Sequence, residues 1–222
     1  MGTLYIVSTP IGNLDDITLR AIDTLKSVDL IVCEDTRISG KLLAHYQIEK
    51  PMLALNDFNE TRQVPVVISR LEDSDVALVS DAGTPLISDP GYKLVREAIA
   101  KGIKVESIPG PSSIIAALTV SGLPPDKFFF FGYLSKKDQK RQKELEDVKR
   151  LKGVIKSSVI FFESPYRLLK TLEDIKNVFG DIDIVVCREL TKVHEEVKRE
   201  KVSSSIEHFA KTPPKGEFVV LI

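Results

Sequence analysis

Residues Val76 to Gly91 read V-A-L-V-S-D-A-G-T-P-L-I-S-D-P-G. The apolar run at their start is typical of a buried strand. The two glycines and two prolines that follow end that strand in an irregular loop. Gly83 can adopt a positive φ and lets a ligand approach the backbone, while Pro85 and Pro90 fix their own φ. Open α/β sheets bind small molecules at such strand exits, so we expect Asp81 to Gly91 to hold a ligand.

The rest of the first half alternates between short apolar runs and stretches with helical spacing. Strands are expected at Leu4–Ser8, Asp29–Cys33, Leu53–Leu55, Val76–Val79 and Lys104–Ile108. Helices are expected at Thr18–Val28, Thr61–Leu71, Gly91–Lys101 and Ser112–Val120. This alternation predicts a parallel sheet with helices on its faces.

A stiff connector, S-G-L-P-P-D-K, is expected at Ser121–Lys127. Beyond it, strands are expected at Phe128–Phe131, Ser158–Phe162, Ile182–Cys187 and Glu217–Leu221, and helices at Lys136–Lys156 and Tyr166–Phe179. The sequence therefore predicts two α/β domains, residues 1–120 and residues 128–222, joined by residues 121–127.

Composition limits the class of protein. The chain has 222 residues, 43% of them hydrophobic, and a net charge of −1, which argues against a binder that is basic throughout. Cys33 and Cys187 lie inside apolar runs and are expected to be buried thiols. His194 has no second histidine at metal spacing, so no metal site is expected. There is no leader-like start and no apolar run of membrane length, and we expect a cytoplasmic protein.

Five further segments resemble ligand loops by position, and each has an ordinary alternative. S-T-P-I-G-N-L, E-D-T-R and P-G-P-S-S could be simple turns, solvated charges or helix caps. E-S-P-Y-R and C-R-E-L-T-K-V-H-E-E could likewise be surface segments. They are Ser8–Leu14, Glu34–Arg37, Pro109–Ser113, Glu163–Arg167 and Cys187–Glu196. Neither the dinucleotide fingerprint nor the P-loop pattern is present, which disfavours both nucleotide sites.

Positive charge is concentrated in one segment of the second half. Residues 136–156 hold nine basic and four acidic side chains, a local balance of +5. Such a stretch is suited to a phosphate backbone, and it is equally typical of a solvated helix.

Taken together and in order, these segments closely resemble the small-subunit ribosomal RNA methyltransferases of the tetrapyrrole methylase family. The resemblance runs over essentially the whole chain. It implies two α/β domains with S-adenosylmethionine bound in the cleft between them, and a homodimer. It implies 2′-O-methylation of a cytidine ribose in the decoding region of 16S rRNA.

The chain also departs from the wider family. Tetrapyrrole methylases tend to have G-D-P where this chain has Gly83-Thr84-Pro85, and a glycine-rich first loop where it has S-T-P-I-G-N-L. Both departures favour RNA over a porphyrin-like substrate. Similar proteins often carry a small helical segment beyond the position of Ile222. A methyltransferase acting on a tetrapyrrole or another small molecule, and a non-catalytic RNA-binding module, are the competing hypotheses.

The resemblance and the chemistry of the reaction assign candidate site residues. Expected cofactor contacts are Pro10, Asp81, Ala82, Gly83, Thr84, Ile87, Ser112, Ser113, Glu163 and Leu190. A ribose hydroxyl is a poor nucleophile, so a general base would help; candidates are Glu163, Glu189, Asp35, and Lys192 if its pKa is depressed. Expected RNA contacts are Arg37, Lys136, Lys137, Lys140, Arg141 and Arg188.

Overall fold

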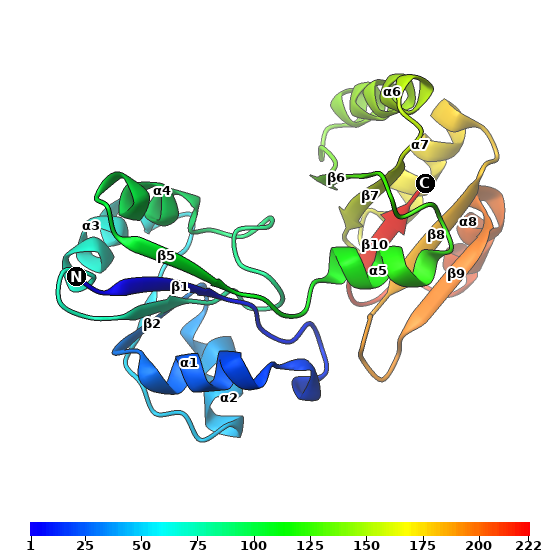
Figure 1. Ribbon diagram of the computed structural model, residues 1–222. Coiled ribbons are helices and arrows are strands. Elements are labelled where there is room, and N and C mark those ends of the chain that lie inside the picture. The colour runs from blue at the N-terminus through cyan, green and yellow to red at the C-terminus, as the bar shows by residue number, and fades with distance from the viewer. The chain divides into compact units, whose positions relative to one another are not determined.

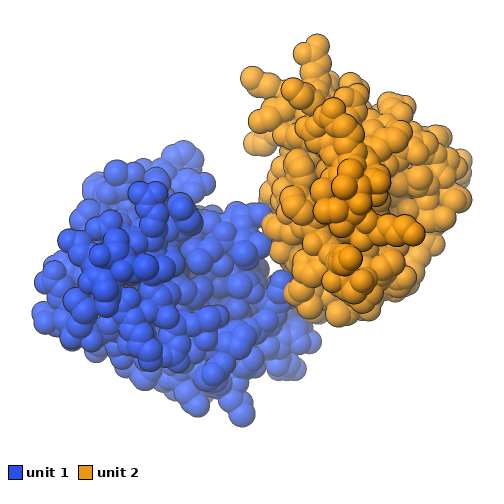
Figure 2. Space-filling model, turned by 45° about the horizontal axis from the view of Figure 1, so that its top comes forward, with its two compact units in different colours: residues 1–112 blue, residues 113–222 orange.

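The computed structural model describes residues 1–222 and divides them into two compact units, residues 1–112 and residues 113–222 (Figure 2). The two α/β units were predicted, but the division falls before the helix α5 (Ser113–Ser121) and not at the proline-rich connector. The reason is packing, because α5 lies against the strands β9 (Glu196–Lys201) and β10 (Phe218–Leu221) of the second unit.

The first unit is built on a five-stranded sheet in the order β3-β2-β4-β1-β5, with every neighbouring pair parallel. Its strands are β1 (Thr3–Val7), β2 (Leu30–Cys33), β3 (Met52–Ala54), β4 (Val76–Leu78) and β5 (Lys104–Ile108). Its helices are α1 (Leu19–Ser27), α2 (Thr36–His45), α3 (Glu60–Arg70) and α4 (Tyr92–Ala100), with a short 3-10 turn, η1 (Leu14–Asp16).

Alternating side chains divide the core of this unit into two layers. Val76 and Leu78 point into the cluster formed with α3 and α4, whereas Ala77 and Val79 point into the cluster formed with α1 and α2. Figure 1 shows the two helix pairs on opposite faces of the sheet. The parallel sheet with covered faces is thus confirmed, and all its strands leave the sheet at one edge.

The second unit holds a mixed sheet in the order β6-β7-β10-β8-β9. Its remaining strands are β6 (Phe128–Tyr133), β7 (Ser158–Glu163) and β8 (Asp183–Arg188), and its remaining helices are α6 (Asp138–Val154), α7 (Leu168–Phe179) and α8 (Val202–Lys211). Only β6 and β7 pair in parallel; β10 is antiparallel to both β7 and β8. Consequently β7 and β8 run in the same direction and end at the same edge.

Three elements are absent from the sequence-based prediction. In α2 only Ser39 and Leu43 are buried, so the segment has little apolar periodicity. The strand β9 reads E-V-K-R-E-K and is held by antiparallel pairing to β8 along the backbone. In α8 the buried set is Val202, Ser205 and Phe209, a weak stripe within a polar segment. Their formation depends on neighbours that the local pattern does not reveal.

The position of α5 gives a test of the domain boundary. A fragment of residues 113–222 is expected to unfold cooperatively in urea. A fragment of residues 122–222 should lose on the order of 3 kcal/mol or more of unfolding free energy, because apolar surface on α5 and on the sheet becomes exposed. Circular dichroism during urea titration measures both. Equal stabilities would place α5 outside the second unit.

Candidate functional site

Three strand exits of the first unit are joined by hydrogen bonds. Beyond β1 and β4, the Thr9 and Gly83 backbones exchange two bonds: the Thr9 amide donates to the Gly83 carbonyl at 2.9 Å, and the Gly83 amide to the Thr9 carbonyl at 3.0 Å. The Thr84 hydroxyl donates to the Pro111 carbonyl at 3.1 Å, and the Ser8 hydroxyl lies 3.2 Å from that of Thr84. The exits of β1, β4 and β5 therefore form one connected surface.

The loop from Asp81 to Gly91 has an unusual backbone. Gly83 has a φ of +78°, and a Cβ there would lie 3.2 Å from Ile11 Cγ2. Leu86 and Ser88 also have positive φ, 75° and 67°, although neither is a glycine. Backbone strain of this kind persists only where the surroundings hold it, and it clusters at binding sites. The loop is thus rigid and shaped, as its sequence predicted.

A buried carboxylate holds the far end of the same loop. Glu60 Oε1 accepts hydrogen bonds from the Gly91 amide at 3.1 Å and the Lys93 amide at 3.3 Å, and Oε2 pairs with Lys93 Nζ at 3.1 Å. Gly91 has a φ of +116°, and a Cβ there would lie 2.7 Å from Leu78 Cδ2. The loop is therefore anchored at both ends, to the exit of β1 through Thr9 and to the start of α3 through Glu60.

Carboxylates gather at this edge with altered proton affinities. Burial raises the pKa of Glu34 and of Asp81, and neighbouring carboxylates raise the pKa of Glu34 further. Burial raises the pKa of Asp89 to about 6, although a hydrogen bond from Ser80 opposes the shift. Asp35 differs because its hydrogen bonds with Arg37 lower its pKa to about 2. A cationic ligand would stabilise the charged forms of the first three.

The expected cofactor contacts fall on both units. The joined loops of the first unit contain Pro10, Asp81, Ala82, Gly83, Thr84, Ile87 and Ser112. In the second unit, Ser113 begins α5, Glu163 is the last residue of β7, and Leu190 follows the end of β8 by two residues. Phe218 of β10 pairs with Glu163 on one side and Arg188 on the other, so these two strand ends flank it.

Glu163 is a fully engaged carboxylate. Its Oε1 accepts from the Ser164 amide at 2.7 Å and pairs with Arg167 Nη2 at 2.7 Å, and its Oε2 accepts from the Thr171 hydroxyl at 2.6 Å. Its side chain is 0% exposed. Glu163 therefore fixes the turn between β7 and α7 and lacks the exposure that a general base needs.

Glu189 and Lys192 are partners in an ion pair after β8. Lys192 Nζ donates to Glu189 Oε1 at 2.9 Å and to Glu217 Oε2 at 3.0 Å. Burial alone would lower the pKa of Lys192, but its hydrogen bonds with the two carboxylates outweigh burial and raise the pKa. Burial alone would raise the pKa of Glu189, but its hydrogen bonds with Lys192 and the Glu217 amide outweigh burial and lower the pKa. The expected base role of Lys192 required a depressed pKa, so that hypothesis is wrong for this geometry.

The loop after β8 also has an unusual backbone and lies beside a pocket. Glu189 and Thr191 have positive φ, 50° and 67°. A pocket of about 290 Å³ lies beside them, lined by Arg188, Glu189, His194, Lys215 and Gly216. The segment from Cys187 to Glu196, which could have opened a helix, is instead a structured loop leading into β9.

The expected RNA contacts separate into exposed and buried cations. Lys136, Lys137 and Lys140 are exposed at the start of α6. Arg141 is 1% exposed and pairs with Asp174 at 2.7 Å and Asp138 at 3.0 Å, so the prediction that it contacts RNA is wrong. The physical reason is its helical phase, which turns it toward α7 beside Leu145 and away from its lysine neighbours.

The two remaining arginines are already partnered. Arg37 is exposed, and its guanidinium pairs with Asp35 at 2.5 Å. Arg188 is half-buried and donates from Nε to the Lys215 carbonyl at 2.8 Å. Arg37 keeps its Nη1 donors free of the Asp35 pair, so it is the better placed of the two to contact a phosphate.

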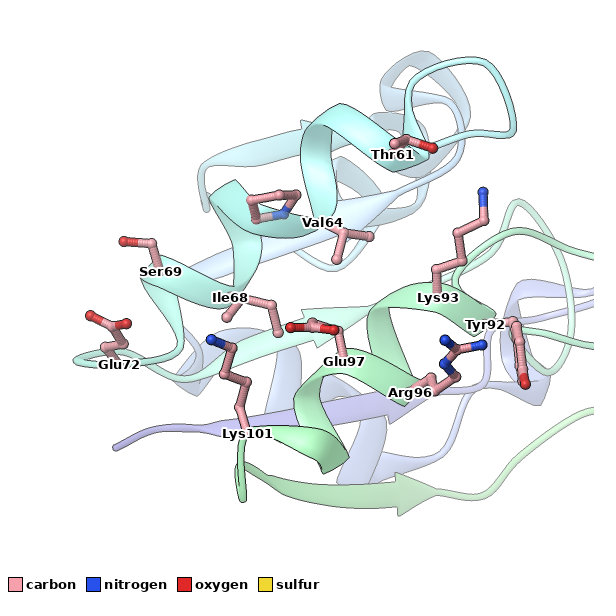
Figure 3. Close-up of a pocket in the computed structure, with 11 residues that line it drawn as sticks. Thr61, Val64, Ile68, Ser69, Glu72, Tyr92, Lys93, Arg96, Glu97 and Lys101 are labelled. Carbon is pink, nitrogen blue, oxygen red and sulfur yellow. The ribbon is translucent and has the colours of Figure 1, made fainter.

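A separate groove of about 690 Å³ lies between α3 and α4 (Figure 3). Val64 and Ile68 form an apolar floor, and Lys93, Arg96 and Glu97 of α4 line one side. Figure 3 shows Tyr92 and Lys93 near the start of α4, and Glu72 and Lys101 at the opposite end. The groove lies between helices that cover the sheet, and one end of it, at Tyr92 and Lys93, directly follows Gly91 at the end of the anchored loop.

Three acidic residues of the site, Glu34, Glu60 and Asp89, were not among the predicted site residues. Asp89 lies inside the opening loop, but its raised pKa depends on burial that sequence does not give. Glu60 is an acidic residue at a helix start, where a solvated carboxylate is usual. Three or more metal-ligating side chains do not come together at any point. No helix is both long and apolar enough to cross a bilayer.

Comparison with known proteins gives concordant matches. Residues 3–205 match the family model described as Tetrapyrrole (Corrin/Porphyrin) Methylases. The chain is 48% identical to the ribosomal RNA small subunit methyltransferase I of Thermotoga maritima, over 100% of this chain and 98% of the relative. It is 45% identical to the protein of that name from Synechocystis sp., over 100% of this chain and 79% of the relative.

Solved structures agree on the fold. A diphthine synthase matches with a TM-score of 0.73 at 16% identity, over 100% of this chain and 89% of that one. A cobalt precorrin-4 methyltransferase of cobalamin biosynthesis matches with a TM-score of 0.72 at 20% identity, over 99% of this chain and 94% of that one. At these identities the likeness concerns the fold alone.

The buried ion pair yields a prediction about Arg141. Asp174→Ala is expected to lower the unfolding free energy by about 3–5 kcal/mol, because it leaves a buried guanidinium without its main partner. Lys140→Ala, one residue away on the exposed side, should stay within about 0.5 kcal/mol of the parent. Urea denaturation measures both. If both variants change the unfolding free energy by similar small amounts, the Arg141–Asp174 pair is not structural, and Arg141 would be available to contact RNA.

The raised pKa of Asp89 yields a prediction about pH. The folded state holds this proton more tightly than the unfolded state, so Asp89 favours folding below about pH 4, and this contribution is lost as pH rises through about 6. Relative to the parent, Asp89→Asn should therefore become more stable as pH rises from 4 to 7. Urea midpoints at several pH values test this. A difference independent of pH would contradict the assignment.

Proposed function

Because the chain belongs to the tetrapyrrole methylase family and, within it, to the ribosomal RNA small subunit methyltransferase I group, we propose that it methylates small-subunit rRNA with S-adenosylmethionine. The acceptor we propose is the 2′-hydroxyl of a cytidine in the decoding region. The observation that carries the proposal is the anchored loop Asp81–Gly91, joined to the exits of β1 and β5.

The residues of the first unit suit this cofactor. Gly83 leaves the loop surface free of a side chain, and Thr84 and Ser112 bring hydroxyls to the same edge. Glu34, Asp81 and Asp89 supply negative charge, which suits a ligand with a positive sulfonium and ammonium. When bound, S-adenosylmethionine supplies an activated methyl group. We propose that Pro10, Ala82, Ile87, Ser113, Glu163 and Leu190 complete the contacts.

The main task of the protein in this reaction is positioning. Holding sulfur, methyl carbon and hydroxyl oxygen in line can lower the barrier by about 7 kcal/mol or more. The anchors at Thr9 and Glu60 prevent the loop from relaxing, so a ligand resting on it would be held in one place. This rigidity is what supports a catalytic role over passive binding.

The proton of the ribose hydroxyl needs an acceptor whose pKa is near neutral. Asp35 has a pKa of about 2, Glu189 has a lowered pKa, and Glu163 is enclosed. We therefore propose the carboxylates with raised pKa as better candidates, with Asp89 first among them. The lysines at the start of α6 would hold the RNA backbone, in a homodimer acting in the cytoplasm.

The decisive experiment uses labelled S-adenosylmethionine and small ribosomal subunits from a strain that lacks the endogenous methyltransferase. We expect label in the rRNA, resistant to alkaline cleavage at one cytidine, because a 2′-O-methyl blocks cleavage of the adjacent phosphodiester. Label on a base would refute the 2′-O assignment. Cofactor binding without any label in RNA would refute the proposed substrate.

A pair of glycine variants tests the cofactor loop. Gly83→Ala and Gly102→Ala both place a side chain at positive φ, +78° and +73°, with strain of about 1–2 kcal/mol each. The added Cβ has no neighbour within 4 Å at Gly102, whereas at Gly83 it meets Ile11. Calorimetry should show at least tenfold weaker cofactor binding for Gly83→Ala alone. Equal affinities of the two variants for S-adenosylmethionine would contradict the placement of the cofactor against Gly83.

A further inference from the structure

Phe58 projects fully into solvent from a short turn after β3. Its exposed fraction is 102%, the highest of the large hydrophobic side chains. A phenylalanine usually contributes to stability through burial, and this one contributes nothing in that way. The ring is therefore available on the first unit as a contact surface for a ligand.

The turn that carries Phe58 is rigid. Asn56 Oδ1 accepts hydrogen bonds from the amides of Phe58 and Asn59, both at 3.2 Å. In return Asn59 Oδ1 accepts from the Asn56 amide at 2.8 Å, and Asn59 Nδ2 donates to the Ala54 carbonyl at 3.0 Å. Reciprocal bonds of this kind fix the backbone on both sides of the ring, so little conformational freedom is left to lose on binding.

The turn also belongs to the edge where the candidate site lies. The Leu55 amide donates to the Cys33 carbonyl at 2.8 Å, which aligns the exits of β3 and β2. Two residues beyond Phe58, Glu60 donates from its amide to the Asn56 carbonyl at 2.8 Å. The Glu60 carboxylate anchors Gly91 at the end of the proposed cofactor loop. One residue therefore connects the Phe58 turn to that loop.

The carboxylates near the Phe58 turn indicate which chemical groups a ligand of the ring would carry. Asp57 and Asp89 both act electrostatically on Glu34, so carboxylates stand around this edge. They would repel a phosphate but accept hydrogen bonds from an exocyclic amino group. An exposed aromatic ring is a stacking surface for a nucleobase.

We propose that Phe58 stacks on a nucleobase of the RNA substrate beside the cofactor loop, with the neighbouring carboxylates favouring a base that carries an amino group. This inference rests on the proposed function and names the residue that would position its acceptor. Phe58 is thus a positioning residue for the RNA.

The chain contains no tryptophan, which allows a direct test. Phe58→Trp introduces a single fluorophore at the proposed contact, and Ile99→Trp introduces one at another exposed site, near the end of α4. Titration with small-subunit rRNA should quench most of the Phe58→Trp emission and leave Ile99→Trp nearly unchanged. Equal behaviour of the two would overturn the proposal. So would a shift that follows protein concentration without RNA, which indicates contact between copies.

Kinetics separate stacking from a general apolar effect. Phe58→Ala should raise the KM for RNA about tenfold, with unchanged melting temperature and unchanged affinity for S-adenosylmethionine. Phe58→Tyr should have the KM of the parent, because its ring can still stack, whereas Phe58→Leu should have a raised KM like that of Phe58→Ala. An unchanged KM in Phe58→Ala, or full rescue by leucine, would refute the role. If rRNA quenches the Phe58→Trp emission but neither the parent protein nor any variant methylates rRNA, the proposed function is refuted. The contact between Phe58 and a base would then still hold.

Discussion

The backbone exchange between Thr9 and Gly83 is the constraint on which the candidate site depends. It joins the loops beyond β1 and β4 through an isolated antiparallel bridge, with hydrogen bonds of 2.9 and 3.0 Å. Gly83 must then take a positive φ against Ile11, which only glycine does without strain. The Thr84 hydroxyl consequently reaches the Pro111 carbonyl, and the exit of β5 joins the same surface. Three hydrogen bonds thus join the loops beyond β1, β4 and β5 into one structured edge.

Each unit fixes a strand exit with a buried carboxylate. In the first unit Glu60 accepts from the Gly91 and Lys93 amides, and in the second Glu163 accepts from the Ser164 amide and the Thr171 hydroxyl. Carboxylates satisfied in this way hold the backbone around them in one conformation. Burial instead raises the pKa values of Glu34, Asp81 and Asp89. The surroundings, and not the residue type, separate the carboxylates that hold backbone from those whose pKa is raised.

Local sequence predicted most strands and helices because the elements bury alternating or helically spaced apolar side chains. The exceptions are elements held by backbone pairing or by a narrow buried stripe, such as β9 and α2. The domain boundary shows the same limit. The proline-rich segment at 121–127 has the composition of a linker, but α5 before it packs on β9 and β10, so the unit begins at Ser113.

The sequence by itself determined the positions of the loops at the strand exits, because glycine, proline and small polar residues restrict the backbone locally. It also determined the family resemblance, which rests on the order of those loops. Only the tertiary structure decided which charged side chains are exposed to a ligand and which carboxylates have a shifted pKa. Arg141 and Lys140 are neighbours in sequence, yet one is enclosed by Asp174 and the other is exposed. Asp35 and Asp89 are the same residue type, yet their pKa values are about 2 and about 6. Burial and electrostatics act through space, between residues that the linear chain keeps apart.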